Sequence, residues 1–261
     1  MSPKKKIRED FIRNILAERG SVSVGSLAET LDVSMQTIRR DLDKLSASEN
    51  WHRAYGRISV AKSLLNTPFE LRASTNLKGK QAIAEVTAAQ IPDGSTIFIS
   101  IGSTPLEVSK ALLSKRDLTV ITNNLGAALT LGNETSNRIL IPGGEIRLPD
   151  KDIIGEETEQ FFDRFRAEFA IFGVGGVAKD GGLLDFHPAE VQARLKMKKH
   201  SSKSILVLDS SKFIRHAPAA GDNITNLDLV ICDNPGPTPT SNLILSLKNK
   251  IIFAEQETET L

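Results

Sequence analysis

Hydrophobic residues recur at helical spacing in three segments near the start of the chain. The first covers residues 4–19 and ends at Gly20, the residue type that commonly follows the last turn of a helix. A second, shorter helix is predicted to begin at Ser23 or Val24, and a third at Ser34, whose hydroxyl is a suitable N-cap. Because only a brief turn separates the last two helices, the pattern predicts a helix-turn-helix domain.

The third helix is predicted to have one apolar and one polar face. Ile38, Leu42 and Leu45 follow at helical spacing and form the apolar face. The opposite face carries an amide, a hydroxyl and guanidinium groups, which read base edges and contact phosphates in DNA. An ordinary solvated helix face is the alternative. In the DNA-binding interpretation, bases are contacted by Gln36, Thr37 and Arg40, next to the capping residue Ser34, and phosphates by Arg39 and Lys44.

Residues 51–60 alternate in character, as expected for a two-stranded wing. In that interpretation Arg53 and Arg57 lie over the phosphate backbone of DNA. The other interpretation, compatible with the first, is a hairpin that closes the small core with Trp51 and Tyr55 as buried plugs.

A stretch of turn-forming residues follows the wing and predicts a linker. We therefore expect a mostly α-helical, winged helix-turn-helix domain at residues 1–60, a linker at 61–75 and a larger domain at 76–261.

Short apolar runs alternate with amphipathic segments from residue 80 onward. This alternation predicts a mainly parallel α/β sheet with helices on both faces. In such sheets, ligands bind at the carboxyl ends of the strands. Strands are predicted at 96–101, 118–122, 138–141, 169–174, 204–208, 227–232 and 251–254, and helices at 81–90, from Pro105, after Asn124, and at 156–165 and 189–200.

Small residues occupy the end of the first predicted strand. Gly102, Ser103 and Thr104 allow the backbone to approach an anion, and their amides and hydroxyls can bind it. The alternative is a capping box, in which Thr104 is the N-cap and Glu107 competes with a phosphate for the same amides. The spacing favours neither interpretation over the other.

Other strand ends carry similar chemistry. Asn123 with Asn124, and Gly143 with Gly144, follow two further strands, where plain turns are the alternative. Lys212 follows a third strand and is a candidate to neutralise a phosphate. Weaker candidates for effector binding are Lys80, Asp185 and Glu190.

The glycine-rich stretch 173–178 contains a dinucleotide-binding pattern that we reject. A turn at residues 179–182 follows at once, so no helix N-terminus is available to hold a pyrophosphate.

Charge is distributed unevenly along a chain whose net charge is only +1. Residues 1–62 hold 12 Lys and Arg against 8 Asp and Glu, whereas residues 63–261 hold 21 against 24. A basic N-terminal region on a mildly acidic body fits a nucleic-acid module joined to another domain.

The remaining composition excludes several classes of protein. Cys232 is the only cysteine, so an internal disulfide is excluded and a reducing compartment is expected. The four histidines lack metal-ligand spacing, and we expect neither a metal nor a cofactor. The sequence has no apolar run of about 18 residues and no apolar region in its charged N-terminal segment. We therefore expect a cytoplasmic protein with no membrane partner.

Residues 33–42, Val-Ser-Met-Gln-Thr-Ile-Arg-Arg-Asp-Leu, match the pattern VSxxTIRRDL. This resembles the helix-turn-helix signature of the DeoR family of bacterial repressors. The wing departs from the family pattern, because Tyr55 replaces the usual His and Arg57 the second Gly of an Arg-x-His-Gly-Gly ending.

The order of GST, TNN, PGG and DSSKF along the larger domain resembles the effector domain of the same family. That domain is similar to the fold of ribose-5-phosphate isomerase and the glucosamine-phosphate deaminases. The stretches ISIGSTP, TVITNN, PGGEIR and IIGE look most like the group that represses glycerol-3-phosphate regulons. Departures from that group are Ser103, where GTT is usual, and Pro188 with Ala189.

The resemblance implies a homo-oligomeric transcriptional repressor, a dimer or tetramer, that binds a double-stranded DNA operator. Its implied effector is a phosphorylated metabolite such as glycerol 3-phosphate or a sugar phosphate. One alternative is an activator rather than a repressor. Another is a sugar-phosphate isomerase or deaminase, with Asp185, Glu190 or Asp209 as the carboxylate that moves a proton.

Overall fold

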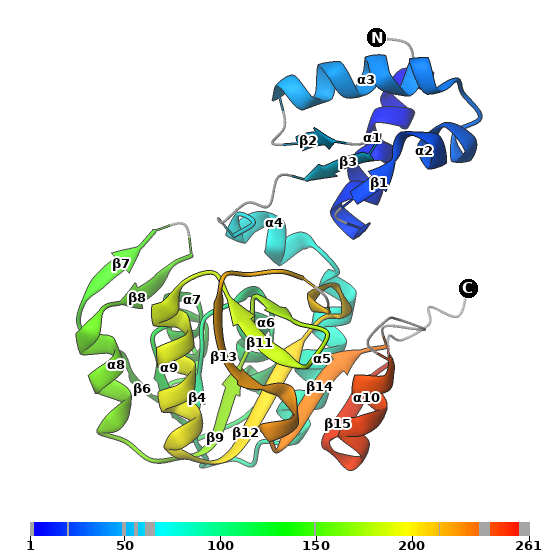
Figure 1. The fold of residues 1–261 in the computed structure, drawn as a ribbon. Helices are drawn as coiled ribbons and strands as arrows, with labels where there is room; N and C mark the ends of the chain where they lie inside the picture. The colour runs from blue at the N-terminus through cyan, green and yellow to red at the C-terminus, as the bar shows by residue number, and fades with distance from the viewer. Residues whose placement is uncertain are drawn as a thin grey trace. The chain divides into compact units, whose positions relative to one another are not determined.

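The computed structural model describes residues 3–19, 21–48, 51–54, 57–60, 66–148, 150–213, 215–234 and 241–255. The chain divides into two compact units, Met1–Leu65 and Asn66–Leu261 (Figure 1). Each unit has its own hydrophobic core, as expected for domains.

The first unit packs three described helices against a small antiparallel sheet. Ser23 caps the second helix by accepting a hydrogen bond from the Ser26 amide at 2.9 Å. Ser34 likewise accepts one from the Thr37 amide at 3.2 Å, which confirms its predicted capping role. The elements are α1 (Pro3–Arg19), β1 (Ser21–Ser23), α2 (Val24–Thr30), α3 (Met35–Ser48), β2 (Trp51–Ala54) and β3 (Arg57–Val60).

The predicted apolar face of α3 is the centre of this unit's core. Ile38 and Leu42 are fully buried, and Leu45 is 4% exposed. The wing is part of a three-stranded sheet in the order β1-β3-β2. The sequence does not predict β1, because three residues are too few to show a strand period.

A buried ion pair joins α1 to α3. Arg8 Nε donates to Asp41 Oδ2 at 2.5 Å, and the Asp41 side chain is only 7% exposed. The aspartate therefore lies on the inner side of α3, away from the polar face predicted to contact DNA.

The second unit is built on a seven-stranded, all-parallel sheet in the order β15-β14-β12-β9-β4-β5-β6. These strands correspond to the seven apolar runs of the sequence, so the prediction of a parallel sheet is confirmed. They are β4 (Thr96–Ile99), β5 (Thr119–Thr122), β6 (Arg138–Leu140), β9 (Ala167–Phe172), β12 (Ser201–Leu208), β14 (Leu229–Asp233) and β15 (Ile251–Ala254).

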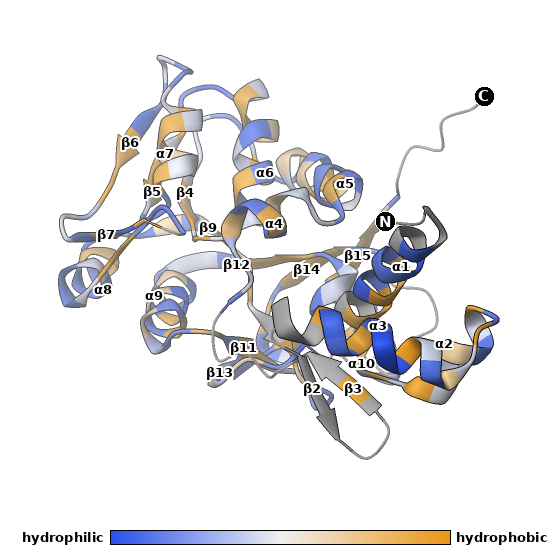
Figure 2. Ribbon diagram, turned by 90° about the horizontal axis from the view of Figure 1, so that it is seen from above, coloured by the Kyte–Doolittle hydropathy of each residue, from blue (hydrophilic) through white to orange (hydrophobic). Residues whose placement is uncertain are grey.

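Helices cover both faces of this sheet, and Figure 2 shows the apolar strands between two helical layers. Alternate side chains of each strand enter different cores. Phe98, for example, packs in the core under the second layer, whereas its neighbours Ile97 and Ile99 pack under the first. The first layer is α5 (Leu77–Ala89), α6 (Ser103–Ala111) and α7 (Leu125–Leu131), and the second is α8 (Glu156–Asp163), α9 (Pro188–Lys199) and α10 (Ser241–Leu247).

Two smaller sheets and two short helices, α10 and α4 (Phe69–Ser74), were not predicted. The strands are too short, or too irregular in burial, to show a period of two. They are β7 (Glu145–Arg147) with β8 (Asp152–Ile154), and β10 (Gly176–Val177), β11 (Gly182–Asp185) and β13 (Ala219–Asn223). The strand β10 lies within the glycine-rich stretch and pairs with β11 after a turn, so no helix begins there, as expected.

The linker predicted at 61–75 differs from the structure in its second half. Residues 66–75 belong to the second unit, and α4 (Phe69–Ser74) occupies most of them. This helix has no buried residue and therefore no apolar face for the pattern to reveal.

We expect Arg8→Ala to lower the free energy of unfolding of the first unit by about 2 kcal/mol, because Asp41 then stays buried without its charged partner. The only tryptophan, Trp51, lies in this unit, so its fluorescence during urea denaturation of the full chain is a suitable measurement. The control is Asp10→Ala, which breaks an exposed ion pair with Arg13 and should cost less than about 0.5 kcal/mol. Equal losses for both variants would contradict the importance of the buried pair.

Candidate functional site

A cavity lies where the strand order of the large sheet reverses. From β4 the chain continues outward through β5 and β6, whereas β9 returns to the other side of β4. The loops after β4 and β9 therefore diverge at the carboxyl edge, which is where open α/β sheets bind ligands. Of the residues that the sequence nominates for effector binding, the lining contains Gly102, Ser103, Thr104, Asn123, Asp185, Glu190 and Lys212.

The capping box proposed as an alternative for the start of α6 is not present. The N-cap is Gly102, not Thr104, and no side chain caps the helix. Gly102 has a φ of 126°, and a Cβ there would lie 3.2 Å from Pro105 Cδ, so glycine is required. Glu107 instead forms an ion pair with Lys110 at 2.6 Å. The amides of the first turn are thus available to an anion in the cavity.

Lys212 supplies a positive charge to the same cavity. It ends a short 3-10 turn, Ser210–Lys212, which is capped by Asp209 through the Ser211 amide at 3.1 Å. No hydrogen bond or ion pair connects its ammonium group to another of the described residues. Desolvation lowers the pKa of Lys212 to about 8, against the opposing attraction of Asp209. An ammonium group that is partly desolvated and unpaired is suited to bind an anion.

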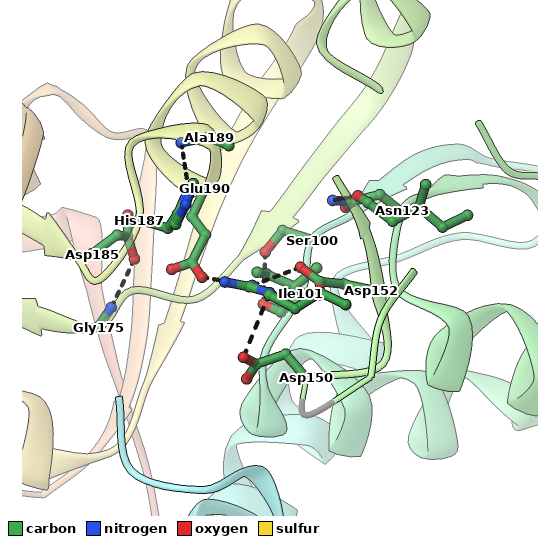
Figure 3. Close-up of polar contacts among 12 residues, drawn as sticks. Ser100, Ile101, Asn123, Asp150, Asp152, Gly175, Asp185, His187, Ala189 and Glu190 are labelled. Atoms are coloured by element: carbon green, nitrogen blue, oxygen red, sulfur yellow. Dashed lines mark hydrogen bonds and ion pairs between the residues drawn. The ribbon is translucent and has the colours of Figure 1, made fainter. Parts of the chain in front are cut away.

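Three acidic side chains of the cavity lining, Asp150, Asp152 and Glu190, lie near one another (Figure 3), and one arginine pairs with all three. Arg147, on β7, makes a bidentate pair with Asp152 at 3.0 and 2.7 Å. It also contacts Glu190 on α9 at 2.6 Å and Asp150 at 3.6 Å. Burial raises the pKa of both Asp152 and Glu190, and Arg147 opposes that effect. The arginine thereby joins the β7–β8 hairpin to α9 across the site.

Asp185 is held in place by the fold around it. Its Oδ1 accepts a hydrogen bond from the Gly175 amide at 2.8 Å (Figure 3), and its Oδ2 accepts one from Arg194 Nη2 at 3.0 Å. Asp185 thus connects the glycine-rich loop after β9 to the middle of α9.

Four nominated residues do not line the cavity. Asn124 is the N-cap of α7: its Oδ1 accepts from the Ala127 amide at 3.1 Å, and its Nδ2 donates to the Ser100 carbonyl at 3.2 Å. Lys80 is 1% exposed and donates to the carbonyls of Arg72 and Thr75, beside Asp209. Both side chains are engaged in holding elements together.

Gly143 and Gly144 also lie outside the lining. Gly144 has a φ of 138°, and a Cβ there would lie 3.0 Å from both Ile153 Cγ2 and the Ile154 carbonyl. Glycine is therefore required for the close approach of this loop to β8, rather than for contact with a ligand.

The polar face of α3 is accessible. Gln36, Arg39, Arg40 and Lys44 are exposed, and Thr37 is partly exposed. Thr37 also shares a hydrogen bond with Ser34, their hydroxyl oxygens lying 2.9 Å apart. The side chains of Trp51, Arg53 and Arg57, and the whole of Tyr55, lie outside the described residues.

The described residues contain no group of three or more His, Cys, Asp or Glu side chains placed to hold a metal ion. Among the described helices, none has both the length and the apolar character needed to cross a membrane.

Comparison with known proteins assigns each unit to a known domain family. The DeoR-like helix-turn-helix domain matches residues 8–64, and the DeoR C terminal sensor domain matches residues 75–234. The chain belongs to the DeoR family. The glycerol-3-phosphate regulon repressor of Escherichia coli (strain K12) is 39% identical over 241 residues, which are 92% of this chain and 96% of the relative. The transcriptional repressor CsqR of the same strain is 36% identical over 252 residues, 96% of each chain.

Solved structures show weaker similarity to this DeoR-family protein. Ribose 5-phosphate isomerase A of Methanocaldococcus jannaschii is 14% identical with a TM-score of 0.38, over 52% of this chain and 54% of that one. The eIF2B beta subunit of Chaetomium thermophilum is 16% identical with a TM-score of 0.44, over 82% and 72%. Membership of the DeoR family does not depend on these values.

The DeoR-family signature contains residues of two kinds. Ile38, Asp41 and Leu42 are buried and hold α3 in the domain, whereas Gln36, Arg39 and Arg40 are exposed. The sequence reveals the apolar pair through its spacing, but the role of Asp41 depends on Arg8, which lies 33 positions away.

Several residues of the sensor-domain cavity, three arginines among them, are not predicted from the sequence. Arg72 donates to Asp150 across 78 positions, and Arg215 donates to the Gly175 carbonyl across 40. No local motif marks either residue, because their partners become neighbours only in the folded chain. The lining residues not nominated include Asn66, Arg72, Asp150, Asp152, Thr158, Arg194 and Arg215.

Phosphate-ester binding at the cavity is expected to weaken as the pH rises through about 8. The ammonium form of Lys212, which attracts the anion, is lost as the pH passes its lowered pKa, whereas the ester is already dianionic there. Titration calorimetry with glycerol 3-phosphate between pH 7 and pH 9.5 measures this. Lys212→Arg keeps its charge and should flatten the profile. An unchanged decline in that variant would exclude Lys212 as the titrating group.

Proposed function

We propose that this DeoR-family protein is a cytoplasmic transcriptional repressor. A phosphorylated metabolite binds it and lowers its affinity for operator DNA. The observation that carries the proposal is the pairing of two anion-binding groups in one cavity. The amides of α6, which no side chain caps, and the ammonium of Lys212, unpaired within the described part of the chain, both line this space. The relatives named above are repressors, which supports repression over activation.

The DNA-binding half of the proposal is supported by the exposed face of α3. In helix-turn-helix proteins the second helix of the motif enters the major groove and its first turns contact base edges. Gln36 and Arg40 carry the side-chain types that make bidentate contacts with adenine and guanine. Arg39 flanks that face and Lys44 lies on it, both are exposed, and we propose that they contact phosphates. Helix-turn-helix proteins bind half-sites as symmetric pairs, so we propose a homo-oligomer, a dimer or tetramer.

The effector half is supported by the division of the cavity into two chemical regions. The α6 amides and Lys212 suit a phosphate group. The Glu190 carboxylate, whose side chain is 10% exposed, is a hydrogen-bond acceptor in the lining, and such a group suits the hydroxyls of a polyol or sugar. A phosphorylated polyol such as glycerol 3-phosphate, or a sugar phosphate, carries both kinds of group.

The enzyme alternative has little support in the geometry. Asp185 is bonded to Gly175 and Arg194, and Glu190 is paired with Arg147. Asp209 is fully buried outside the cavity lining. Each candidate carboxylate is thus engaged or out of reach, whereas a general base must reach the proton that it removes.

Arg40→Ala is expected to lower affinity for operator DNA about tenfold or more, since one good base contact contributes roughly 1–3 kcal/mol of discrimination. Lys44→Ala should weaken binding to all sequences alike and reduce the salt slope by about one. Band shifts with the DNA upstream of the chain's own gene, at several salt concentrations, measure both. Lys179→Ala, an exposed site in the sensor domain, is the control. Full operator affinity in the Arg40 variant would count against α3 as the reading helix.

Glycerol 3-phosphate or a sugar phosphate is expected to release the operator in the same band shift. Gly102→Ala should bind DNA normally but lose most of this response, because an added Cβ displaces the first turn of α6. Gly94→Ala is a matched control, since Gly94 also has a positive φ, 76°, but no atom near its Cβ position. An equal loss of response in both variants would show that backbone strain, not the anion site, is responsible.

A further inference from the structure

The first residues of the second unit are bound by an arginine that lines the cavity. Arg215 lines the cavity, and its Nη2 donates to Asn66 Oδ1 at 3.1 Å and to Thr67 Oγ1 at 3.0 Å. Its Nη1 donates to the Gly175 carbonyl at 3.1 Å, in the glycine-rich loop after β9. One guanidinium group therefore connects the wall of the cavity to the start of the domain.

A second arginine makes a parallel connection. Arg72 also lines the cavity, and its Nε donates to the Thr67 carbonyl at 2.8 Å. Its Nη2 forms an ion pair with Asp150, which contacts the Arg147 cluster described above. We name Asn66 and Thr67 the tether, because the two arginines bind these residues. In sequence, residues 61–65 lead from the DNA-binding domain directly into the tether.

The acceptors on the tether are weak competitors for these arginines. A carboxamide, a hydroxyl and a backbone carbonyl are neutral, whereas hydrogen bonds from guanidinium to phosphate are charge-assisted and roughly twice as strong. Burial lowers the pKa of Arg215, and the neighbouring positive charge of Arg72 lowers it further. An anion beside the two groups would relieve that repulsion, so both guanidiniums are attracted toward a bound phosphate.

We propose that a phosphate ester in the cavity competes with the tether for Arg215 and Arg72, and that release of the tether is how the sensor domain signals an occupied site. This inference rests on the proposed effector function and adds its mechanism. An effector shifts an equilibrium only by its differential affinity for two states. Here that difference arises because the same donors serve either residues 66 and 67 or the phosphate.

Hydrogen–deuterium exchange of the full chain tests the release directly. The probes are glycerol 3-phosphate and, separately, inorganic phosphate at millimolar concentration. Peptides covering 100–108 should lose deuterium uptake, because the α6 amides become hydrogen-bonded. Peptides covering 66–75 should gain uptake at the same time.

The outcomes separate the two proposals. Protection at 100–108 without any rise at 66–75, or protection of both segments together, overturns the tether mechanism but leaves the effector site intact. An absence of change at 100–108 with both probes counts against the effector site itself, and the tether mechanism fails with it.

A variant provides a second test. It should change the affinities for the ester and for DNA in opposite directions, whereas a general loss of structure would weaken both. Thr67→Val removes one acceptor from Arg215 and keeps the residue's shape. Glycerol 3-phosphate should then bind about threefold more tightly, operator DNA more weakly, and the ratio of DNA affinities with and without the ester should fall toward one. Thr75→Val removes a hydroxyl whose one hydrogen bond among the described residues goes to the Leu71 carbonyl, and it should behave like the unmodified protein. Weaker binding of both ligands by Thr67→Val would show a merely structural role for Thr67 and overturn the inference.

Discussion

The parallel pairing of β4 with β9 is the constraint on which the sensor domain depends. β4 continues to one side of the sheet and β9 to the other, so the loops that follow them separate at the carboxyl edge. The cavity between those loops receives the first turn of α6 and the residues after β12. Residues more than 100 positions apart, such as Ser103 and Lys212, therefore share one lining.

Charge neutralisation explains which side chains of the cavity connect structural elements and which are available to bind an anion. Asp152, Glu190 and Asp185 each face an arginine from another element, and removing a buried partner would leave an uncompensated charge. Lys212 has no such partner among the described residues. Arg72 and Arg215 are intermediate in how strongly they are paired. Arg215 binds neutral groups, and Arg72 binds a backbone carbonyl and Asp150. An anion would find the least competition at Lys212 and the next least at these two.

The two domains place their functional groups differently. In the helix-turn-helix domain, a single helix carries the whole polar face, so its residues lie close together both in sequence and in space. The sensor-domain cavity draws on loops after several strands and on α4 and α9. A ten-residue pattern can therefore represent the first site, whereas the second has no continuous signature.

Local patterns determined most of the secondary structure and which residues of α3 are buried or exposed. The period of 3.6 in α3 placed Ile38 and Leu42 inside, and the seven apolar runs became the seven parallel strands, because burial on both faces requires apolar residues throughout. Tertiary structure alone decided which polar residues meet. Arg72 lies in a segment that reads as linker, and Asn124 resembles a site residue although it caps α7. Ion pairs and caps depend on partners brought close by strand order, and strand order arises from the packing of the whole sheet rather than from any one segment.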